Sequence, residues 1–389
     1  MKKIFIFLAA LACNYSFSQY KFVLEGKVQD STKKKIYLEI RDDYSLNEYV
    51  KIDSCIIQKG SFQFSGELNK KSEIANLFFI DESKIRSDPD KFRFILDNGI
   101  NVINVDFPKV HSTSLFSNAK RPVSVSNDLY NKLNYLYENY FEKYASNVKT
   151  WDPKKPEEIS MVKMLDNPEI TVKLRKEQLQ IVKNYSNSFY SLIFLYESLH
   201  YRPYIKSPSL LVEIFNNLNE SIKNTPLGNE FIKECLHIMK VEKETSTQHQ
   251  VPIFKIKTDK EDTFTNASLL GKPYIIAFSA TWCTPCKKME PKLKSFYNNY
   301  KDKGLEVIYF NFDDNDKKWK EHIFKNQLDW INVSDGLKAG SSPIIKQFNI
   351  IGIPQYIVVD KNGTIIYNST DPSDSNFLML ESYILKAIQ

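Results

Sequence analysis

The stretch SATWCTPCKK, Ser279–Lys288, decides the fold of this chain of 389 residues. Its two cysteines, Cys283 and Cys286, have two residues between them and follow the apolar run Tyr274–Phe278. Cysteines at this spacing can form a catalytic dithiol, half of a metal site or a structural disulfide. The sequence on either side of the pair distinguishes between these possibilities.

The cysteine pair lies where a predicted strand passes into a predicted helix. An uninterrupted apolar run such as Tyr274–Phe278 is typical of a strand that is buried on both faces. The residues from about Cys283 to Tyr300 predict a helix, so Cys283 faces the N–H groups and positive dipole of its first turn. This position favours a nucleophilic thiolate. Cys286, one turn later, is placed to attack a mixed disulfide at Cys283, and Pro285 is tolerated because its missing N–H needs no intrahelical acceptor.

The metal and structural alternatives are weaker. A structural zinc site usually takes a full tetrahedral set of ligands, often from a second paired cluster. The chain has no second C-x-x-C pair, and its five histidines are scattered singly. A static disulfide would close a loop too short to add much stability. We therefore expect exchange chemistry at Cys283 and Cys286, with no metal ion and no cofactor besides their redox-active disulfide.

Three regions of different character make up the rest of the chain. Residues 20–115 are strand-like runs between turn residues, such as Asp97–Gly99, and predict an antiparallel β domain. Residues 120–248 show apolar side chains at helical spacing and predict an all-helical region. Residues 251–389 alternate strands and helices in the order β-α-β-α-β-β-α, which predicts a small α/β domain with a mixed sheet flanked by helices. The polar segment that ends at Gln250 is the predicted linker.

The charge distribution argues against a nucleic-acid partner. The formal net charge of +6 comes from 53 basic and 47 acidic residues. These charges are spread along the chain, and no dense lysine and arginine stripe occurs of the kind that nucleic acid requires. We expect a solvated, mildly basic surface.

Cys55 and Cys235 lie far from the pair in sequence. Cys55 belongs to a strand-like run and Cys235 to a helix-like one. Unpaired cysteines are among the most buried residue types, so both are predicted to be small core residues. A disulfide between them is the less favoured alternative.

The N-terminus predicts export. Lys2 and Lys3 precede the short apolar run Ile4–Ala12, and Ser16–Ser18 forms a small-x-small cleavage site. We expect residues 1–18 to be a signal peptide and the protein to reach the periplasm or cell envelope. The second interpretation is a lipoprotein signal, in which Cys13 would be lipidated.

Residues 252–389 resemble the thioredoxin superfamily, and within it the TlpA/ResA-like envelope thiol–disulfide oxidoreductases. The resemblance is carried by GKPYIIAFSATWCTPCKKMEPKL, with Trp282 before the cysteines and Pro291 inside the helix, and by GIPQYIVVDKNG. It implies that Pro354 is a cis-proline that faces the dithiol, and that the backbone of Ile353 pairs with a bound substrate strand.

The resemblance also implies a function. Cys283 would attack a substrate disulfide and Cys286 would resolve the mixed disulfide, so that disulfides of envelope proteins are reduced. A membrane partner would supply the electrons. The pair Thr284-Pro285 is similar to that of reducing members of the family. The region 20–107 resembles a β domain that often precedes such thioredoxins and that brings no settled activity.

One departure from the family pattern leaves the proton route open, and two alternative functions also remain. Ala277 stands where cytoplasmic thioredoxins have a buried aspartate, so the proton route needs another carboxylate or water. A peroxiredoxin-like peroxidase would share the fold, but the resemblance implies an arginine beside its cysteine, and none follows Arg202. A third hypothesis is an envelope binding module, in which the β and helical regions hold a ligand and the redox domain is accessory.

Overall fold

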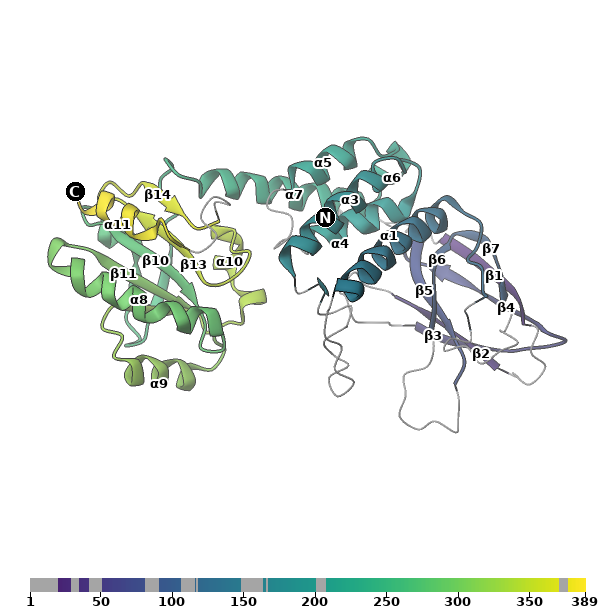
Figure 1. Ribbon diagram of the computed structural model, residues 1–389, viewed down its shortest axis with the longest axis horizontal. Helices are drawn as coiled ribbons and strands as arrows, with labels where there is room; N and C mark the ends of the chain where they lie inside the picture. The colour runs from purple at the N-terminus through teal and green to yellow at the C-terminus, as the bar shows by residue number, and fades with distance from the viewer. Residues whose placement is uncertain are drawn as a thin grey trace, which may run out of the picture. The chain divides into compact units, whose positions relative to one another are not determined.

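The computed structural model of this chain contains two compact units (Figure 1). The first unit groups Met1–Ser198 with Ile214–Gly228, and the second groups Leu199–Glu213 with Asn229–Gln389. The structure describes residues 20–28, 35–41, 51–80, 91–105, 116, 118–147, 164–165, 167–200, 208–370 and 377–389. The predicted signal peptide 1–18, with Cys13, lies outside these residues.

The N-terminal part of the first unit consists of two β-sheets. Their strands are β1 (Tyr20–Val28), β2 (Lys35–Ile40), β3 (Lys51–Ile56), β4 (Ser61–Leu68), β5 (Ser72–Phe78), β6 (Lys91–Asp97) and β7 (Gly99–Val105). The strand orders are β4-β1-β7 and β3-β2-β5-β6. Alternate residues of both sheets, among them Leu24, Phe64, Leu38 and Phe94, point into one shared apolar core. The periodicity of two that predicted these strands therefore also selects the side chains that hold the sheets together.

The sheets are antiparallel apart from the pairing of β1 with β7, which is parallel. The predicted turn at Asp97–Gly99 explains the exception. Gly99 has a φ of 93°, a left-handed conformation that glycine adopts without steric cost. The turn does not fold the chain back along β6 but carries it from one sheet to the other, where β7 lies beside β1.

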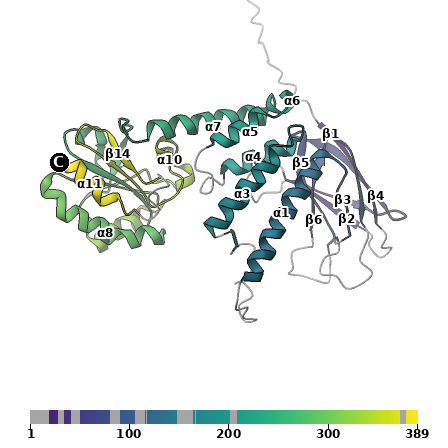
Figure 2. The same ribbon diagram turned by 45° about the horizontal axis from the view of Figure 1, so that its top comes forward.

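Helices follow the sheets. They are α1 (Val125–Asn147), α3 (Pro168–Val182), α4 (Phe189–His200), α5 (Ser209–Asn216), α6 (Glu220–Lys223) and α7 (Pro226–Glu244). Figure 2 shows α1 and α3 side by side. The predicted helical region is thus helical where it is described, but α7 contributes most of its length to the second unit.

Buried polar contacts attach helices to the second sheet of the first unit. The side chain of Asn127 on α1 accepts a hydrogen bond from Ile95 N at 2.9 Å and donates one to Ile95 O at 2.8 Å, so it pairs with the edge strand β6. Arg41, after β2, forms an ion pair of 2.9 Å with Glu197 on α4. Burial raises the pKa of Glu197, and the charge of Arg41 opposes that shift. The strands and first helices therefore form one packed body.

The predicted core cysteines differ from each other. Cys235, on α7, is fully buried, whereas Cys55 is half-buried on β3. The partial exposure of Cys55 follows from the position of β3 at the edge of its sheet. Neither forms a disulfide, so the less favoured alternative is wrong.

The second unit contains the α/β domain. Its strands are β8 (Lys255–Thr258), β9 (Thr263–Thr265), β10 (Tyr274–Ser279), β11 (Glu306–Asn311), β12 (Ile331–Ser334), β13 (Gln355–Val359) and β14 (Ile365–Asn368). Its helices are α8 (Thr284–Tyr300), α9 (Asp316–Asn326), α10 (Pro343–Phe348) and α11 (Leu380–Ile388). The sheet is mixed, with strand order β14-β13-β10-β11-β12-β8-β9. The short strands β8, β9 and β12 were not predicted, because each carries polar residues and is too brief to show a period.

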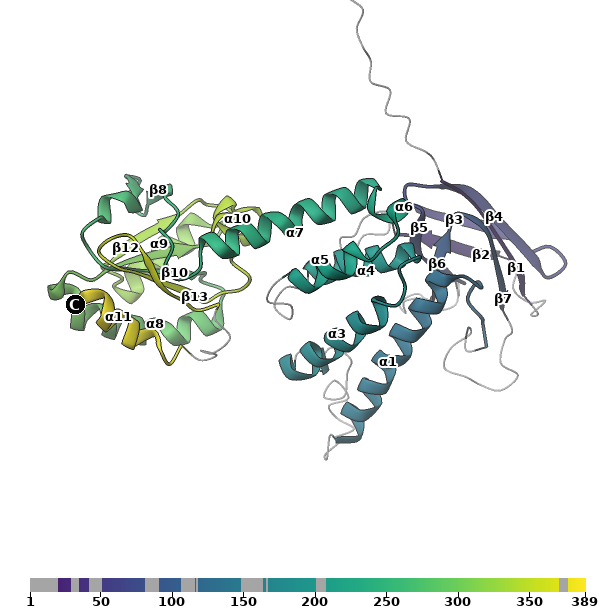
Figure 3. The same cartoon turned by 90° about the horizontal axis from the view of Figure 1, so that it is seen from above.

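The central strand β10 is buried on both faces, as predicted. Ile275 and Ala277 face a core formed with α8 and α11, whereas Ile276 and Phe278 face a core formed with α10. Figure 3 shows α8 and α11 on one side of the sheet and α10 on the other. β10 is thereby held between two apolar cores, and α8 follows it after a short turn.

Candidate active site

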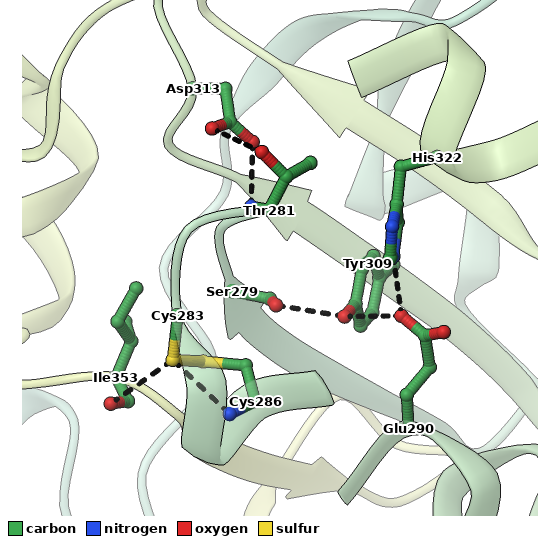
Figure 4. The surroundings of a disulfide bond; sticks show 9 residues. All are labelled: Ser279, Thr281, Cys283, Cys286, Glu290, Tyr309, Asp313, His322 and Ile353. Atoms are coloured by element: carbon green, nitrogen blue, oxygen red, sulfur yellow. Dashed lines mark hydrogen bonds and ion pairs between the residues drawn. A yellow bond between two sulfur atoms is a disulfide. The ribbon is translucent and has the colours of Figure 1, made fainter. Parts of the chain in front are cut away.

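Cys283 and Cys286 form a disulfide at the N-terminus of α8 (Figure 4), with their Cα atoms 5.3 Å apart. The helix begins at Thr284, one residue later than predicted, and Cys283 is its N-cap. The Sγ atom of Cys283 accepts a hydrogen bond from Cys286 N at 3.2 Å. In the reduced protein the same N–H donor and the helix dipole would stabilise a thiolate at Cys283.

A distant loop covers the disulfide. The Sγ atom of Cys283 lies 3.6 Å from the carbonyl oxygen of Ile353. A disulfide sulfur has no proton to donate, so this is a contact in the oxidised state, and only the reduced thiol can donate to Ile353 O. The Ile353–Pro354 bond is cis, as the resemblance implied. Ile353 and Pro354 are both half-buried.

The other predicted site residues lie around the disulfide in different roles. Trp282 is 60% exposed, so its indole is available to a partner surface. Pro285 lies in the first turn of α8, where its missing N–H costs no hydrogen bond. Pro291 lies inside the same helix and is exposed. Both cysteines are buried, at 4% exposed for Cys283 and 2% for Cys286, and of the two Cys283 is the one at the N-cap of α8 and against Ile353.

A residue that the sequence did not single out, Asp313, holds the segment before Cys283. Asp313, just after β11, accepts a hydrogen bond from Thr281 N at 2.8 Å and a second from Thr281 Oγ1 at 2.8 Å. Asp313 is buried, and its own N–H donates to Asn311 Oδ1 at 2.8 Å. This carboxylate therefore fixes the turn that presents Trp282 and Cys283.

We expect Asp313→Ala to slow the reduction of a protein disulfide about tenfold, because loss of positioning of this size is common when a buried hydrogen-bonded acceptor is removed. The measurement is the rate of insulin reduction by the reduced protein. Asp314→Ala, which removes the neighbouring carboxylate outside this contact, is the matched control. Equal rates for the two variants would contradict the role assigned to Asp313.

A buried carboxylate lies on α8 one turn beyond Cys286. The side chain of Glu290, which is 6% exposed, accepts hydrogen bonds from Tyr309 Oη at 3.1 Å and from His322 Nε2 at 2.7 Å. Tyr309 Oη also lies 2.8 Å from Ser279 Oγ, at the end of β10 (Figure 4). A polar chain thus runs from His322, whose side chain is 15% exposed, to the strand that leads into the site.

The hydrogen-bonded side chains of Glu290, Tyr309 and Ser279 lie near Ala277 in the sheet. Ala277 is paired in register with Tyr309 on β11 and with Tyr356 on β13. Burial raises the pKa of both tyrosines well above the ordinary value, and the nearby charge of Glu290 adds to the shift. Glu290 is therefore the carboxylate that reaches this part of the core in the absence of an aspartate at Ala277. The sequence signal for it was its spacing of four residues from Cys286, which puts both side chains on one helical face.

Within the described ranges, no group of three or more His, Cys, Asp and Glu side chains is arranged to hold a metal ion. The acidic and imidazole groups nearest the disulfide are engaged with each other or with Thr281.

Comparison with known families and proteins gives two matched regions. A family described as thioredoxin-like matches residues 271–365, and a domain of unknown function, DUF4369, matches residues 22–130. The first match falls inside the segment predicted to be thioredoxin-like and confirms that prediction. The second covers the predicted β domain and extends into α1.

Several known proteins are similar to part of this chain. The thiol–disulfide oxidoreductase ResA of Bacillus thuringiensis subsp. konkukian is 32% identical over 116 residues, which are 30% of this chain and 64% of ResA. Tryparedoxin of Trypanosoma brucei brucei is 30% identical over 118 residues, which are 28% of this chain and 81% of tryparedoxin. A solved thiol–disulfide oxidoreductase from Bacteroides fragilis is 23% identical, with a TM-score of 0.31 and coverage of 34% of this chain and 98% of that one. The match to the ResA relatives thus spans just under two thirds of their length.

Proposed function

Since its C-terminal domain makes this chain a member of the thioredoxin-like thiol–disulfide oxidoreductases, we propose that the protein is an exported reductase of disulfides in envelope proteins. The observation that carries the proposal is the Cys283–Cys286 disulfide at a helix N-terminus, in contact with the backbone of Ile353. This arrangement supplies a stabilised thiolate, a resolving thiol and a backbone segment for a substrate strand.

The proposed reaction starts from the reduced pair. The Cys283 thiolate attacks one sulfur of the substrate disulfide, which forms a mixed disulfide and releases the other sulfur as a thiolate that takes up a proton. Cys286 then loses its proton and attacks Cys283 Sγ. The second substrate sulfur leaves and is protonated, and the Cys283–Cys286 bridge closes. Two electrons pass to the substrate, and the oxidised state described by the structure is the product.

The resolving step needs a group that takes the proton of the buried Cys286. We assign this role to Glu290, because it lies one turn along the same helical face and is itself buried. Its hydrogen bond to His322 connects it to a partly exposed imidazole, which can pass the proton onward. The hydrogen bond from Tyr309 holds the carboxylate in place.

Glu290→Gln is expected to slow resolution of the mixed disulfide about tenfold or more at neutral pH, because proton transfer by a positioned carboxylate typically contributes at least that much. The measurement is single-turnover thiol release from pH 5 to pH 9. The variant should regain rate toward high pH, where hydroxide replaces the carboxylate. Glu321→Gln on α9, which is exposed, is the control, and an unchanged pH profile in Glu290→Gln would exclude the assignment.

Export and the electron supply are part of the proposal. Support comes from the N-terminal residues: Lys2 and Lys3, then an apolar run and a small-x-small site. We propose cleavage after Ser18 and a periplasmic or cell-envelope location, with lipidation at Cys13 as the second route. Among the described helices, none has the length and apolar character needed to span a membrane. We propose, as the family resemblance implies, that a membrane protein supplies the electrons and reduces the Cys283–Cys286 bridge.

The direction of electron flow can be measured directly. For a reductase we expect a potential nearer thioredoxin's roughly −270 mV than the roughly −120 mV of a strong oxidant. Equilibration of the protein with glutathione or dithiothreitol buffers, followed by thiol alkylation, gives the value. A potential near the oxidising limit would keep the dithiol chemistry but reverse the proposed direction.

A further inference from the structure

A polar pocket in the first unit has no part in the thiol chemistry. It has a volume of about 570 Å³ and lies between the edge strand β6 and α1. Its lining includes Lys91 and Arg93 of β6, Arg121, and Asn134 and Tyr135 of α1. Three of the residues that line it are basic and one, the exposed Glu138, is acidic. A volume in this range is typical of sites for small molecules, roughly 300–1,000 Å³.

Arg121 is held rigidly in this pocket. Its Nε donates to Arg93 O at 2.7 Å, and its Nη1 donates to Asn131 Oδ1 at 2.9 Å. The guanidinium also lies over two aromatic rings, 5.2 Å from the centre of Phe92 and 4.8 Å from that of Tyr130. The hydrogen bonds and ring contacts fix its plane, so little conformational entropy is lost when a ligand binds to it.

The charges around the pocket leave Arg121 without an acidic partner. Lys91 is paired with Glu39 at 2.8 Å, and Glu138 accepts a hydrogen bond from Asn134 at 2.7 Å. Across the part of the chain that the structure describes, Arg121 makes no ion pair, and its Nη2 has no hydrogen-bond acceptor. The edge of the guanidinium that carries Nη2 is thus a preformed donor for an oxyanion.

We propose that this pocket binds a small polar molecule that bears a carboxylate or a phosphate. The oxyanion would be held by the Nη atoms of Arg121, since a planar guanidinium matches carboxylate and phosphate oxygens. The amides of Asn131 and Asn134 would hydrogen-bond hydroxyl or amide groups of the ligand, and Tyr135, 67% exposed, would cover its apolar side. The site lies wholly in the first unit and does not depend on the redox state of Cys283 and Cys286.

Titration calorimetry of the full-length protein tests this inference with three probes: glucuronate, glucose 1-phosphate and uncharged glucose. We expect one or both anions to bind with a dissociation constant of about 1 mM or tighter, and glucose to bind at least about tenfold more weakly. The anion with the lower dissociation constant identifies whether the site prefers a carboxylate or a phosphate. No binding of either anion, or equal binding of glucose, would overturn the proposal.

Matched variants locate the binding. Arg121→Gln should weaken binding of the preferred anion about tenfold or more, because the positive charge and the paired N–H donors of the guanidinium are lost together. Lys132→Gln removes one positive charge from α1 outside the pocket and should leave affinity within about twofold of the unchanged protein, as expected for an exposed charge. Tyr135→Ala tests the site even if Arg121→Gln does not fold, since this exposed ring contributes little to the core; it should weaken binding severalfold. Unchanged affinity in Tyr135→Ala and in any folded Arg121 variant would exclude this pocket.

Discussion

Cys286→Ser is expected to accumulate mixed disulfides with envelope proteins, whereas Cys283→Ser accumulates none. In Cys286→Ser the Cys283 thiolate still attacks, but no thiol remains to close the bridge and release the partner. In Cys283→Ser the attacking sulfur at the helix N-cap, which also contacts the backbone of Ile353, is gone, and Cys286 lies further along α8 without either feature. Turnover should fall by a factor of about a thousand or more in both variants, as when a nucleophile is removed from an enzyme.

The measurement is non-reducing electrophoresis of the tagged variants after acid quenching, with identification of the adducts by mass spectrometry. The double variant Cys283→Ser/Cys286→Ser is the control for adducts through Cys55 or Cys235, neither of which is in a disulfide. Equal trapping by both single variants would show that the roles of attacking and resolving thiol are wrongly assigned. Wild-type turnover in either single variant would contradict the dithiol mechanism itself.

Phe278→Ala is expected to destabilise the α/β domain by about 3–5 kcal/mol, the usual cost of truncating a buried phenylalanine. Phe278 is 1% exposed and lies at the end of β10, directly before the segment that carries the cysteines. Its ring centre is 5.8 Å from that of Phe310, 6.2 Å from that of Phe312 and 5.5 Å from that of Phe348. Truncation therefore leaves a cavity among rings from β10, the end of β11 and α10.

Urea unfolding followed by tryptophan fluorescence measures this loss. Three of the four tryptophans, Trp282, Trp319 and Trp330, belong to the second unit, so the signal reports on the domain that contains Phe278. Phe324→Ala makes the same chemical change at a side chain that is 86% exposed and should alter stability by no more than about 0.5 kcal/mol. Similar losses in the two variants would mean that the aromatic core around Phe278 does not limit the stability of the domain.

Much of the site could be predicted because its signals are local. The signals are the apolar run of one strand and the spacing of Cys283 and Cys286 within one helical turn. The strand β10 and the helix α8 formed where these signals predicted them. The position of Glu290 could have been predicted in the same way, since it lies four residues after Cys286 and so on the same face of the helix. It was missed because a lone glutamate in a lysine-rich helix is normally solvated, and only packing against Tyr309 shows that this one is buried.

Contacts between residues that are far apart in the sequence could not be predicted from local patterns. Asp313 meets Thr281 because the parallel strands β10 and β11 end at the same edge of the sheet, and their pairing register exists only after folding. The strands β1 and β7 lie side by side in parallel although a turn signal before β7 suggested a simple reversal. The pocket at Arg121 likewise needs β6 and α1 to be packed together.

The sequence by itself determined most of the elements and the dithiol at a helix N-terminus, because short-range periodicity and spacing set local backbone structure. The thioredoxin-like nature of the C-terminal domain followed from the resemblance of its motifs to that superfamily. The tertiary structure alone decided that Ile353 contacts Cys283 across a sequence separation of 70, that Glu290 is buried against His322, and that Arg121 faces a pocket. Such contacts depend on how separate elements pack, and packing follows from the summed burial of many apolar side chains rather than from any short stretch of residues.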